Sequence, residues 1–221
     1  MKSILRTIAL LVSLLVLASC NIDFLYIQLP GTSWYYELDG VQAWVHFGPE
    51  DRASVLQTEP ATGKCMNING TWTAHGHAVV ITEDSGTTHK ITRTFSHLKN
   101  SKNKNFSSAY PVDAGSLENT VWTAVRKDSL LVLGFGPGSK AQVAVYKGAS
   151  WTQNEERVYS LVGSHISLEG GKSATFFGGA LLQEDIWLAP VQGRALVQVP
   201  GGVCTLTPQT NTFPFILNLE F

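Results

Sequence analysis

The residues whose spacing is most suggestive of chemistry are His75 and His77, which one glycine separates. Residues at positions i and i+2 of a β-strand project from the same face, so the pair suits zinc or copper coordination once a third ligand joins it. The candidates for that ligand, none at a fixed metal-site spacing, are His89, His97 and Glu83. The favoured alternative is a turn at the glycine with both histidines in solvent. We therefore expect no metal site and no cofactor.

The remaining polar patterns do not predict catalysis. Three pairs of neighbouring carboxylates are present, but adjacent residues on a strand face opposite ways and make poor acid–base dyads. These pairs are Glu83-Asp84, Glu155-Glu156 and Glu184-Asp185. The glycine-rich stretch 134–140 lacks the spacing of a phosphate loop and precedes a strand-like segment, so no helix N-terminus is available for a phosphate. No nucleophile motif of the Gly-x-Ser-x-Gly type is visible. We expect a protein that is not an enzyme.

The N-terminus carries the most specific signal in the chain. Lys2 and Arg6 precede a short apolar run, which ends in Leu17-Ala18-Ser19-Cys20. A charged start, an apolar stretch too short to span a bilayer and small residues before a cysteine are typical of a cleaved signal peptide. The last four residues resemble the bacterial lipobox, which implies cleavage before Cys20 and its acylation with chains such as palmitate. The expected address is the bacterial outer membrane, facing the periplasm, because Asn21 differs from the aspartate that retains lipoproteins in the inner membrane.

With Cys20 assigned to lipid, two cysteines are left, Cys65 and Cys204. In an oxidising compartment two such thiols can form a disulfide, which would connect the first half of the chain to its end. Two separate buried thiols are the equally weighted alternative.

Composition excludes a nucleic-acid surface. The 221 residues carry a net charge of -1, whereas such surfaces need a basic excess to displace counterions from phosphates. Apolar residues make up 44% of the chain, which predicts a folded protein.

A tandem repeat organises the elements that would hold any site. A pattern of Thr-x-Trp, an alternating apolar run, Phe-Gly-Pro and Ala-x-Val occurs twice at a constant offset of 88 residues. The first copy begins at Thr32 and the second at Thr120. Self-similarity over this distance predicts two copies of one structural unit.

Both copies consist of short runs rich in Trp, Tyr, Val, Ile and Thr between Gly, Pro, Asn and Asp, which is typical of strands and turns. We predict an all-β fold of two antiparallel repeats, forming either two small barrels or one pseudo-symmetric barrel. The predicted organisation is signal peptide 1–19, lipidated tether 20–30, first repeat 31–98, linker 99–117, second repeat 118–188, and a tail 189–221 with closing strands. The basic part of the linker, at Lys99, Lys102 and Lys104, is read as solvated, with a lipid-headgroup patch as the less favoured alternative. The tether is apolar enough to lie against the protein, which would keep the first repeat close to the membrane.

The first repeat resembles the small lipocalin-like domains of bacterial lipoproteins. The resemblance rests on Gly31-Thr32-Ser33-Trp34, Phe47-Gly48, Gly70-Thr71-Trp72 and Val79–Thr82. It implies a small barrel or half-barrel that can have an apolar interior, with no known substrate and no functional residue to transfer. Ser33 is an insertion relative to the family's Gly-x-Trp, and Asn119 replaces Gly31 in the second copy.

Two functions fit these observations. The favoured one is a non-enzymatic interaction or structural module of the cell envelope, whose edge strands or exposed aromatic residues contact another envelope protein. The alternative is a carrier whose interior binds a lipid or another apolar small molecule. Barrel size separates the two, because narrow barrels are filled by their own side chains, whereas one wide merged barrel can hold a ligand.

Overall fold

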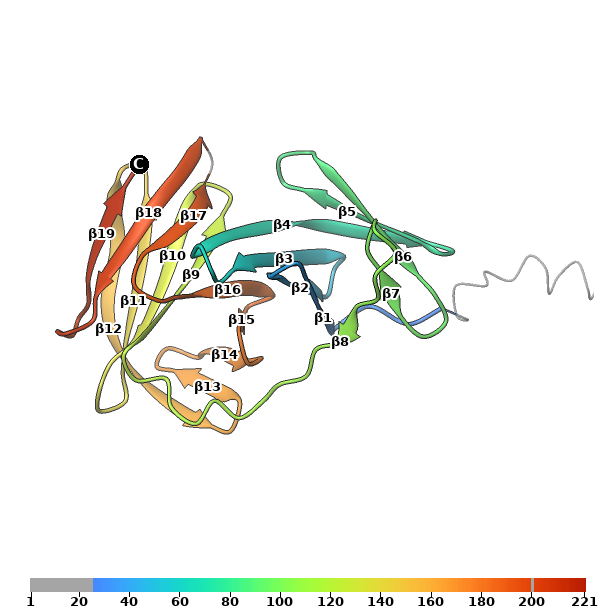
Figure 1. Ribbon diagram of the computed structural model, residues 1–221. Helices are drawn as coiled ribbons and strands as arrows, with labels where there is room; N and C mark the ends of the chain where they lie inside the picture. The colour runs from blue at the N-terminus through green and yellow to red at the C-terminus, as the bar shows by residue number, and fades with distance from the viewer. Residues whose placement is uncertain (1–25, 200) are drawn as a thin grey trace, which may run out of the picture.

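The computed structural model describes residues 26–199 and 201–221, so the predicted signal peptide and Cys20 lie outside the described residues. Every regular element in the described part is a β-strand, which confirms the all-β prediction (Figure 1). In the same part, no helix has the length and apolar character needed to cross a membrane.

The first unit is an antiparallel meander that curls into a barrel-like sheet. Its last strand returns to its first, with Ser107 and Ser108 opposite Tyr35 and Trp34. A bridge between Lys99 and Asn105 connects β7 to the segment before β8. The strands are β1 (Thr32–Leu38), β2 (Val41–Phe47), β3 (Arg52–Glu59), β4 (Lys64–His75), β5 (Ala78–Glu83), β6 (Thr88–Arg93), β7 (Leu98–Lys99) and β8 (Ser107–Ser108).

The second unit repeats this meander as a closed barrel, in which β16 pairs with β9. The strands are β9 (Thr120–Arg126), β10 (Ser129–Phe135), β11 (Lys140–Lys147), β12 (Ser150–Val162), β13 (His165–Leu168), β14 (Lys172–Phe176), β15 (Leu181–Gln183) and β16 (Ile186–Val191). The predicted tandem units are therefore two separate eight-stranded barrels, and not one merged barrel.

Matching hydrogen bonds show why the same motif recurs in both units. The Trp34 indole donates to the Thr32 hydroxyl at 2.8 Å, and the Trp122 indole donates to Thr120 at 3.0 Å. Each threonine hydroxyl in turn donates to a leucine carbonyl three residues earlier. The Thr-x-Trp motif thus satisfies a buried indole N–H at the start of each barrel.

Each barrel is filled by its own side chains. The core of the first contains Trp34, Phe47 and Trp72, all less than a tenth exposed. The core of the second contains Trp122, Phe135 and Tyr159 in matching positions. An eight-stranded barrel is just wide enough for side chains to fill, so these interiors are packed cores.

Three further strands follow the second barrel: β17 (Ala195–Val199), β18 (Gly202–Gln209) and β19 (Ile216–Glu220). They close neither barrel, because both meanders are already complete. Instead β17 pairs in parallel with the start of β4, so the tail extends the sheet of the first barrel to 11 strands. Figure 1 shows this tail lying beside the second barrel.

The predicted domain limits therefore need correction at two places. The linker expected at 99–117 contains β8 and the bridge at Lys99, so its first part belongs to the first barrel. The second unit continues past residue 188, since Ala189, Pro190 and Val191 pair with β9. β8 could not be predicted from the sequence, because two serines after a polar basic run carry no strand pattern.

Candidate functional site

The two barrels meet at a junction where side chains of the first bind the backbone of the second. The Ser54 hydroxyl accepts a hydrogen bond from the Trp187 backbone N–H at 3.2 Å, and the Asn67 amide donates to the Trp187 carbonyl at 2.8 Å. The Asn69 amide donates to the Val125 carbonyl at 2.7 Å. The Trp187 side chain is completely buried against Trp44 and its neighbours. Backbone groups of the second barrel that are satisfied by buried or partly buried polar side chains of the first fix one relative position of the two barrels.

A chain of three polar residues crosses the same junction. His46 Nδ1 lies 2.9 Å from the Ser33 hydroxyl, and His46 Nε2 lies 3.2 Å from Asp185 Oδ1. Since a carboxylate only accepts, Nε2 carries the proton toward Asp185 and Nδ1 accepts from Ser33. Burial lowers the pKa of His46, and the Asp185 hydrogen bond partly opposes that shift.

Serine, histidine and aspartate in series are the components of a hydrolytic triad, but their setting here differs. His46 is 6% exposed and both of its nitrogens are already bonded. Catalysis needs a place for the reacting atom near the nucleophile. The inter-barrel cleft described below is lined by neither Ser33 nor His46. The chain of hydrogen bonds therefore connects the barrels.

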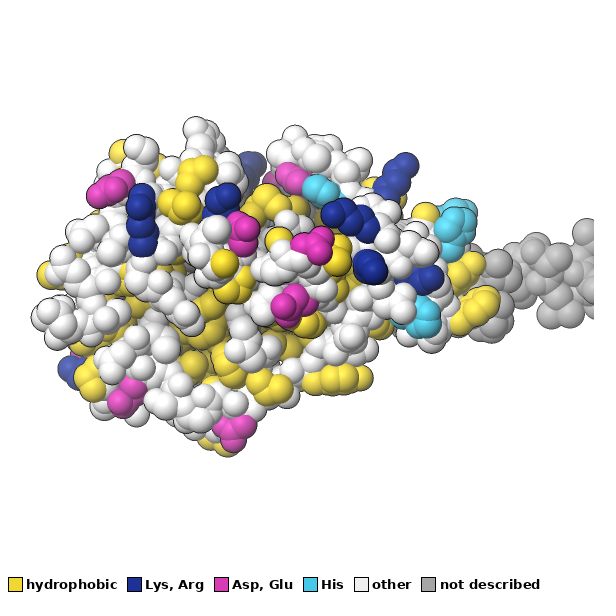
Figure 2. All heavy atoms as spheres, viewed as in Figure 1, with side chains coloured by type: hydrophobic (Ala, Val, Ile, Leu, Met, Phe, Trp, Pro, Cys, Tyr) yellow, Lys and Arg dark blue, Asp and Glu magenta, His cyan; other side chains and the backbone are white. Residues whose placement is uncertain are grey.

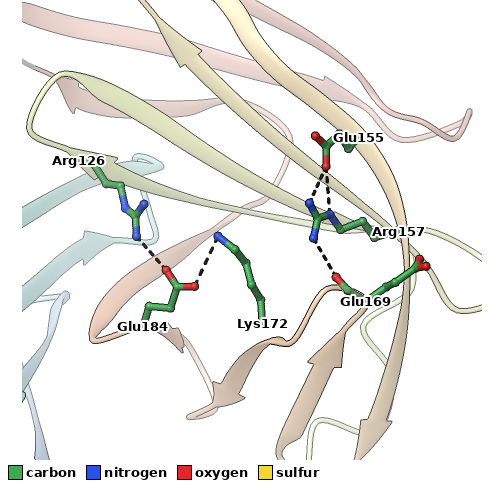
Figure 3. A network of polar contacts seen from close by, with 6 residues as sticks. All are labelled: Arg126, Glu155, Arg157, Glu169, Lys172 and Glu184. Atoms are coloured by element: carbon green, nitrogen blue, oxygen red, sulfur yellow. Dashed lines mark hydrogen bonds and ion pairs between the residues drawn. The ribbon is translucent and has the colours of Figure 1, made fainter.

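The turn that supplies Asp185 has an unusual backbone. Glu184 and Asp185 have φ values of 48° and 63°, a conformation that tight hairpin turns usually reserve for Asn and Gly. Glu184 lies between Arg126 and Lys172, at 3.3 and 3.5 Å, as Figure 3 shows. These contacts hold the turn between β15 and β16 in place, with Asp185 directed to His46.

The tail docks on the second barrel as the second barrel docks on the first. Gln142, which the 88-residue repeat places opposite Ser54, accepts from the Phe215 N–H at 2.9 Å and donates to the Phe215 carbonyl at 3.2 Å. Phe215 is 3% exposed. Gly134 leaves room for its ring, since a β-carbon there would lie 2.5 Å from a ring atom. The same outer face of each barrel therefore captures one aromatic residue through its backbone and its side chain.

A cleft of about 720 Å³ opens between the barrels and the tail. Its apolar lining includes Trp122 and Phe176, and its polar lining includes Glu59, Lys64 and Arg194. The volume lies in the range of small-molecule sites, and such sites are common between domains. The sequence did not predict this cleft, because its walls come from segments far apart in the chain.

An open sheet edge is the other surface available for binding. β19 pairs with β18 on one side and with no strand of the described chain on the other. Pro208, which has no N–H, lies opposite Leu217, so this pair cannot exchange two hydrogen bonds. The backbone N–H and C=O of Leu217, and by alternation those of Leu219, therefore point to the open side. Ile216 is 52% exposed on the same strand.

The two cysteines are free thiols, and the structure places a strand between them. Val197 of β17 pairs with Cys65 on one side and with Cys204 on the other. Two strand spacings put their Cα atoms about 9–10 Å apart, beyond the reach of a disulfide. Of the two alternatives that the sequence left open, the structure shows two separate buried thiols. Burial raises the pKa of Cys65 to about 11.

The histidine pair lies where a turn was expected. His75 ends β4 opposite Ala78, and Gly76 between the histidines has a φ of 54°. Across the described residues, no group of three or more His, Cys, Asp or Glu is arranged to hold a metal ion. His89 instead contacts Glu83, whose pKa is lowered mainly by that hydrogen bond.

Trp34 and Trp122, the tryptophans of the repeated Thr-x-Trp motif, lie in the cores of the two barrels, and Trp72 lies in the core of the first. Trp44 and Trp187 fell outside the repeat pattern, and the structure buries both between the barrels. Their lack of a repeat partner was the available signal for the junction.

Comparison with known proteins gives no family. No protein-family model matches the chain, and no curated protein matches it. Among solved structures, the chain is similar to the Cpx pathway activator NlpE from Escherichia coli, at 11% identity over 85% of this chain and 90% of that one, with a TM-score of 0.27. A second likeness, at 7% identity over 78% of this chain and 60% of that one, with a TM-score of 0.13, is to a putative DNA polymerase III beta subunit from Eubacterium rectale ATCC 33656. At these scores neither likeness bears on function.

Proposed function

We propose that the protein is a non-enzymatic interaction module of the bacterial cell envelope, anchored in the outer membrane through a lipidated Cys20 and facing the periplasm. The signal-like N-terminus and the lipobox support the anchor. The packed barrel interiors favour an interaction module over a carrier that holds its cargo inside a barrel.

The observation that carries this proposal is the open edge of β19. An unpaired edge presents a row of backbone donors and acceptors on which an extended partner segment can add as a strand. Leu217 and Leu219 offer these groups, while their side chains pack against the core between the barrels and the tail. Monomeric proteins usually protect such edges from pairing with charged residues or proline, whereas β19 exposes the apolar side chain of Ile216. The partner is thus a protein with an accessible extended segment.

Site-specific photo-crosslinking in cells that export the protein tests this proposal. A crosslinking residue at Asn218, on the solvent face of β19, should yield one discrete higher-mass product. Val162, which is 77% exposed on β12, is the matched control and should yield none. Equal products from both positions, or none from Asn218, would contradict the edge as the contact.

Charged residues on the edge provide the second test. With the crosslinking residue kept at position 218, Ile216→Lys places a charge on the edge strand without removing a buried contact, and should abolish the crosslink to the partner. Val162→Lys adds a charge away from the edge and should leave it intact. An equal yield of crosslinked partner from the Ile216→Lys variant would rule out strand addition.

The inter-barrel cleft favours a second candidate, a carrier for an apolar molecule with a polar group. Native mass spectra of the mature protein should then show an extra mass that is lost on denaturation. Ser116 lines the cleft and is exposed, so Ser116→Trp should remove that mass, whereas Ser173→Trp, at an exposed position outside the cleft, should retain it. A bare chain in gentle preparations would eliminate the carrier.

A further inference from the structure

A stacked aromatic pair, one ring exposed and the other partly buried, marks one end of the first barrel. Tyr26 and Phe95 stack with ring centroids 5.3 Å apart, and Phe95 is 68% exposed. Arg93 lies over the Tyr26 ring at 5.0 Å, and the Ile27 N–H donates to the Thr94 carbonyl at 3.3 Å. The chain that leads in from the N-terminus is therefore fixed to this end of the barrel.

β6, β7 and the loop after β7 carry basic residues and no acidic residue of their own. No Asp or Glu occurs between Asp84 and Asp113, a span that contains four lysines and one arginine. These are Lys90, Arg93, Lys99, Lys102 and Lys104. Thr92 of β6 pairs with Lys99 of β7, so Lys90 and Lys99 lie diagonally across neighbouring strands. Figure 2 shows several Lys, Arg and His side chains in the right-hand part of the view, with acidic side chains bordering them on the left.

The lysines here differ from those of the second barrel in their partners. Lys140, Lys147 and Lys172 each form an ion pair with a carboxylate. Of the ion pairs between described residues, none involves the four lysines of the basic span. Their charge is therefore available to an external anion.

The length of chain between this end and the predicted anchor limits their separation. Six residues lead from Cys20 to Tyr26, and fully extended residues span at most about 3.6 Å each. The Tyr26–Phe95 end therefore lies within about 22 Å of a lipidated Cys20. Aromatic residues that sit at headgroup depth and basic residues that attract anionic lipids are the two elements of a bilayer-contact surface.

We propose that this end of the first barrel docks on the anionic lipid bilayer, with Phe95 at headgroup depth and the lysines of β6, β7 and the loop after β7 against lipid phosphates. Docking holds the barrels upright on the membrane and directs the second barrel and β19 away from it. This inference rests on the proposed lipid anchor.

The test uses the full lipidated protein in nanodiscs of anionic phosphatidylglycerol or of zwitterionic phosphatidylcholine. A polarity-sensitive fluorophore is attached at Ser96→Cys, beside Phe95, or at Ser150→Cys, an exposed serine of the second barrel. We expect a blue-shifted, quencher-protected signal for position 96 in anionic discs only, and a water-exposed signal for position 150 in both. A water-exposed signal at position 96 in anionic discs overturns docking, while failure of the protein to enter discs at all overturns the anchor instead.

A second experiment removes the charge of three lysines on the proposed surface and compares the result with the same change at three lysines of the second barrel. Lys99→Gln/Lys102→Gln/Lys104→Gln should lower the ratio of docked to undocked molecules by about 100-fold, about five-fold for each lysine. Lys140→Gln/Lys147→Gln/Lys172→Gln removes the same charge from the second barrel and should leave docking unchanged. Equal losses from both triples would reduce the effect to net charge and overturn the assigned surface. Raising the salt concentration should reproduce the loss in the unmodified protein.

Discussion

The two barrels use the same outer face to hold different segments. The first barrel captures Trp187 of the second barrel, and the second captures Phe215 of the tail. In the first barrel two side chains share the task, Ser54 for the N–H and Asn67 for the carbonyl. In the second barrel Gln142 alone bonds both groups.

The residue directly opposite Ser54 or Gln142 on the neighbouring strand decides what kind of segment fits. His46 in the first barrel reaches Asp185, whereas its repeat counterpart Gly134 leaves space for the ring of Phe215. The comparison teaches that the duplicated unit carries a general docking face. Different residues at a few matching positions on that face suit one copy to a neighbouring barrel and the other to the C-terminal tail.

The largest expected effects come from truncating the aromatic side chain that each face holds. Trp187→Ala should destabilise the protein by about 3–5 kcal/mol, because it empties a fully buried site between the barrels. Phe215→Ala should cost a comparable amount but should free mainly the tail, so that β19 exchanges its amide hydrogens and is cleaved by protease first. Denaturant unfolding and hydrogen exchange measure both, and global loss of protection from Phe215→Ala would show that the tail is integral to the second barrel.

The hydrogen bonds to the captured backbone give the next largest effect. Gln142→Leu leaves a buried N–H and a buried carbonyl of Phe215 without that partner, at about 1–3 kcal/mol for each group. Ser54→Ala removes one such bond and should cost about half as much as Gln142→Leu. Urea midpoints compare them, and equal losses would mean that the two bonds of Gln142 do not add.

The glycines on the two faces should differ in their tolerance of a methyl group. A β-carbon at Gly136 would lie 2.2 Å from the Phe213 ring, so Gly136→Ala should cost about 1–3 kcal/mol through overpacking. A β-carbon at Gly48 would lie 3.1 Å from the carboxyl carbon of Asp185, a smaller overlap that a flexible side chain can relieve. Thermal unfolding of the two variants should rank them in that order, and a larger loss for Gly48→Ala would contradict this account of the faces.

The smallest effect concerns pH and applies to the first face alone. Burial lowers the folded-state pKa of His46, so the unfolded chain binds its proton more readily. The resulting stability is complete above the unfolded pKa of about 6.5 and is lost as the pH falls from there toward the lowered folded value. Stability measured from pH 7.5 down to 5.5 should therefore decline less steeply in His46→Gln than in the unmodified protein. Identical slopes would show that His46 does not titrate in this range.

Some parts of the fold were out of reach of sequence reasoning for identifiable reasons. β12 begins at Ser150, but its first half contains Gln153, Asn154, Glu155 and Glu156 and carries no apolar alternation. It pairs with β11 there, so backbone bonds hold a strand that the side-chain pattern does not indicate. β8 is only two residues long, and its place is fixed by pairing with β1.

The sequence by itself determined the all-β class and the duplication, because these depend on local alternation, turn residues and a repeated motif within each unit. Only the tertiary structure decided that both barrels are filled, that Val197 separates Cys65 from Cys204, and that the tail extends the first sheet while docking on the second barrel. The separation of the cysteines and the position of the tail arise from contacts between segments more than 50 residues apart in the chain. Such contacts leave no periodic signal in the residues that make them.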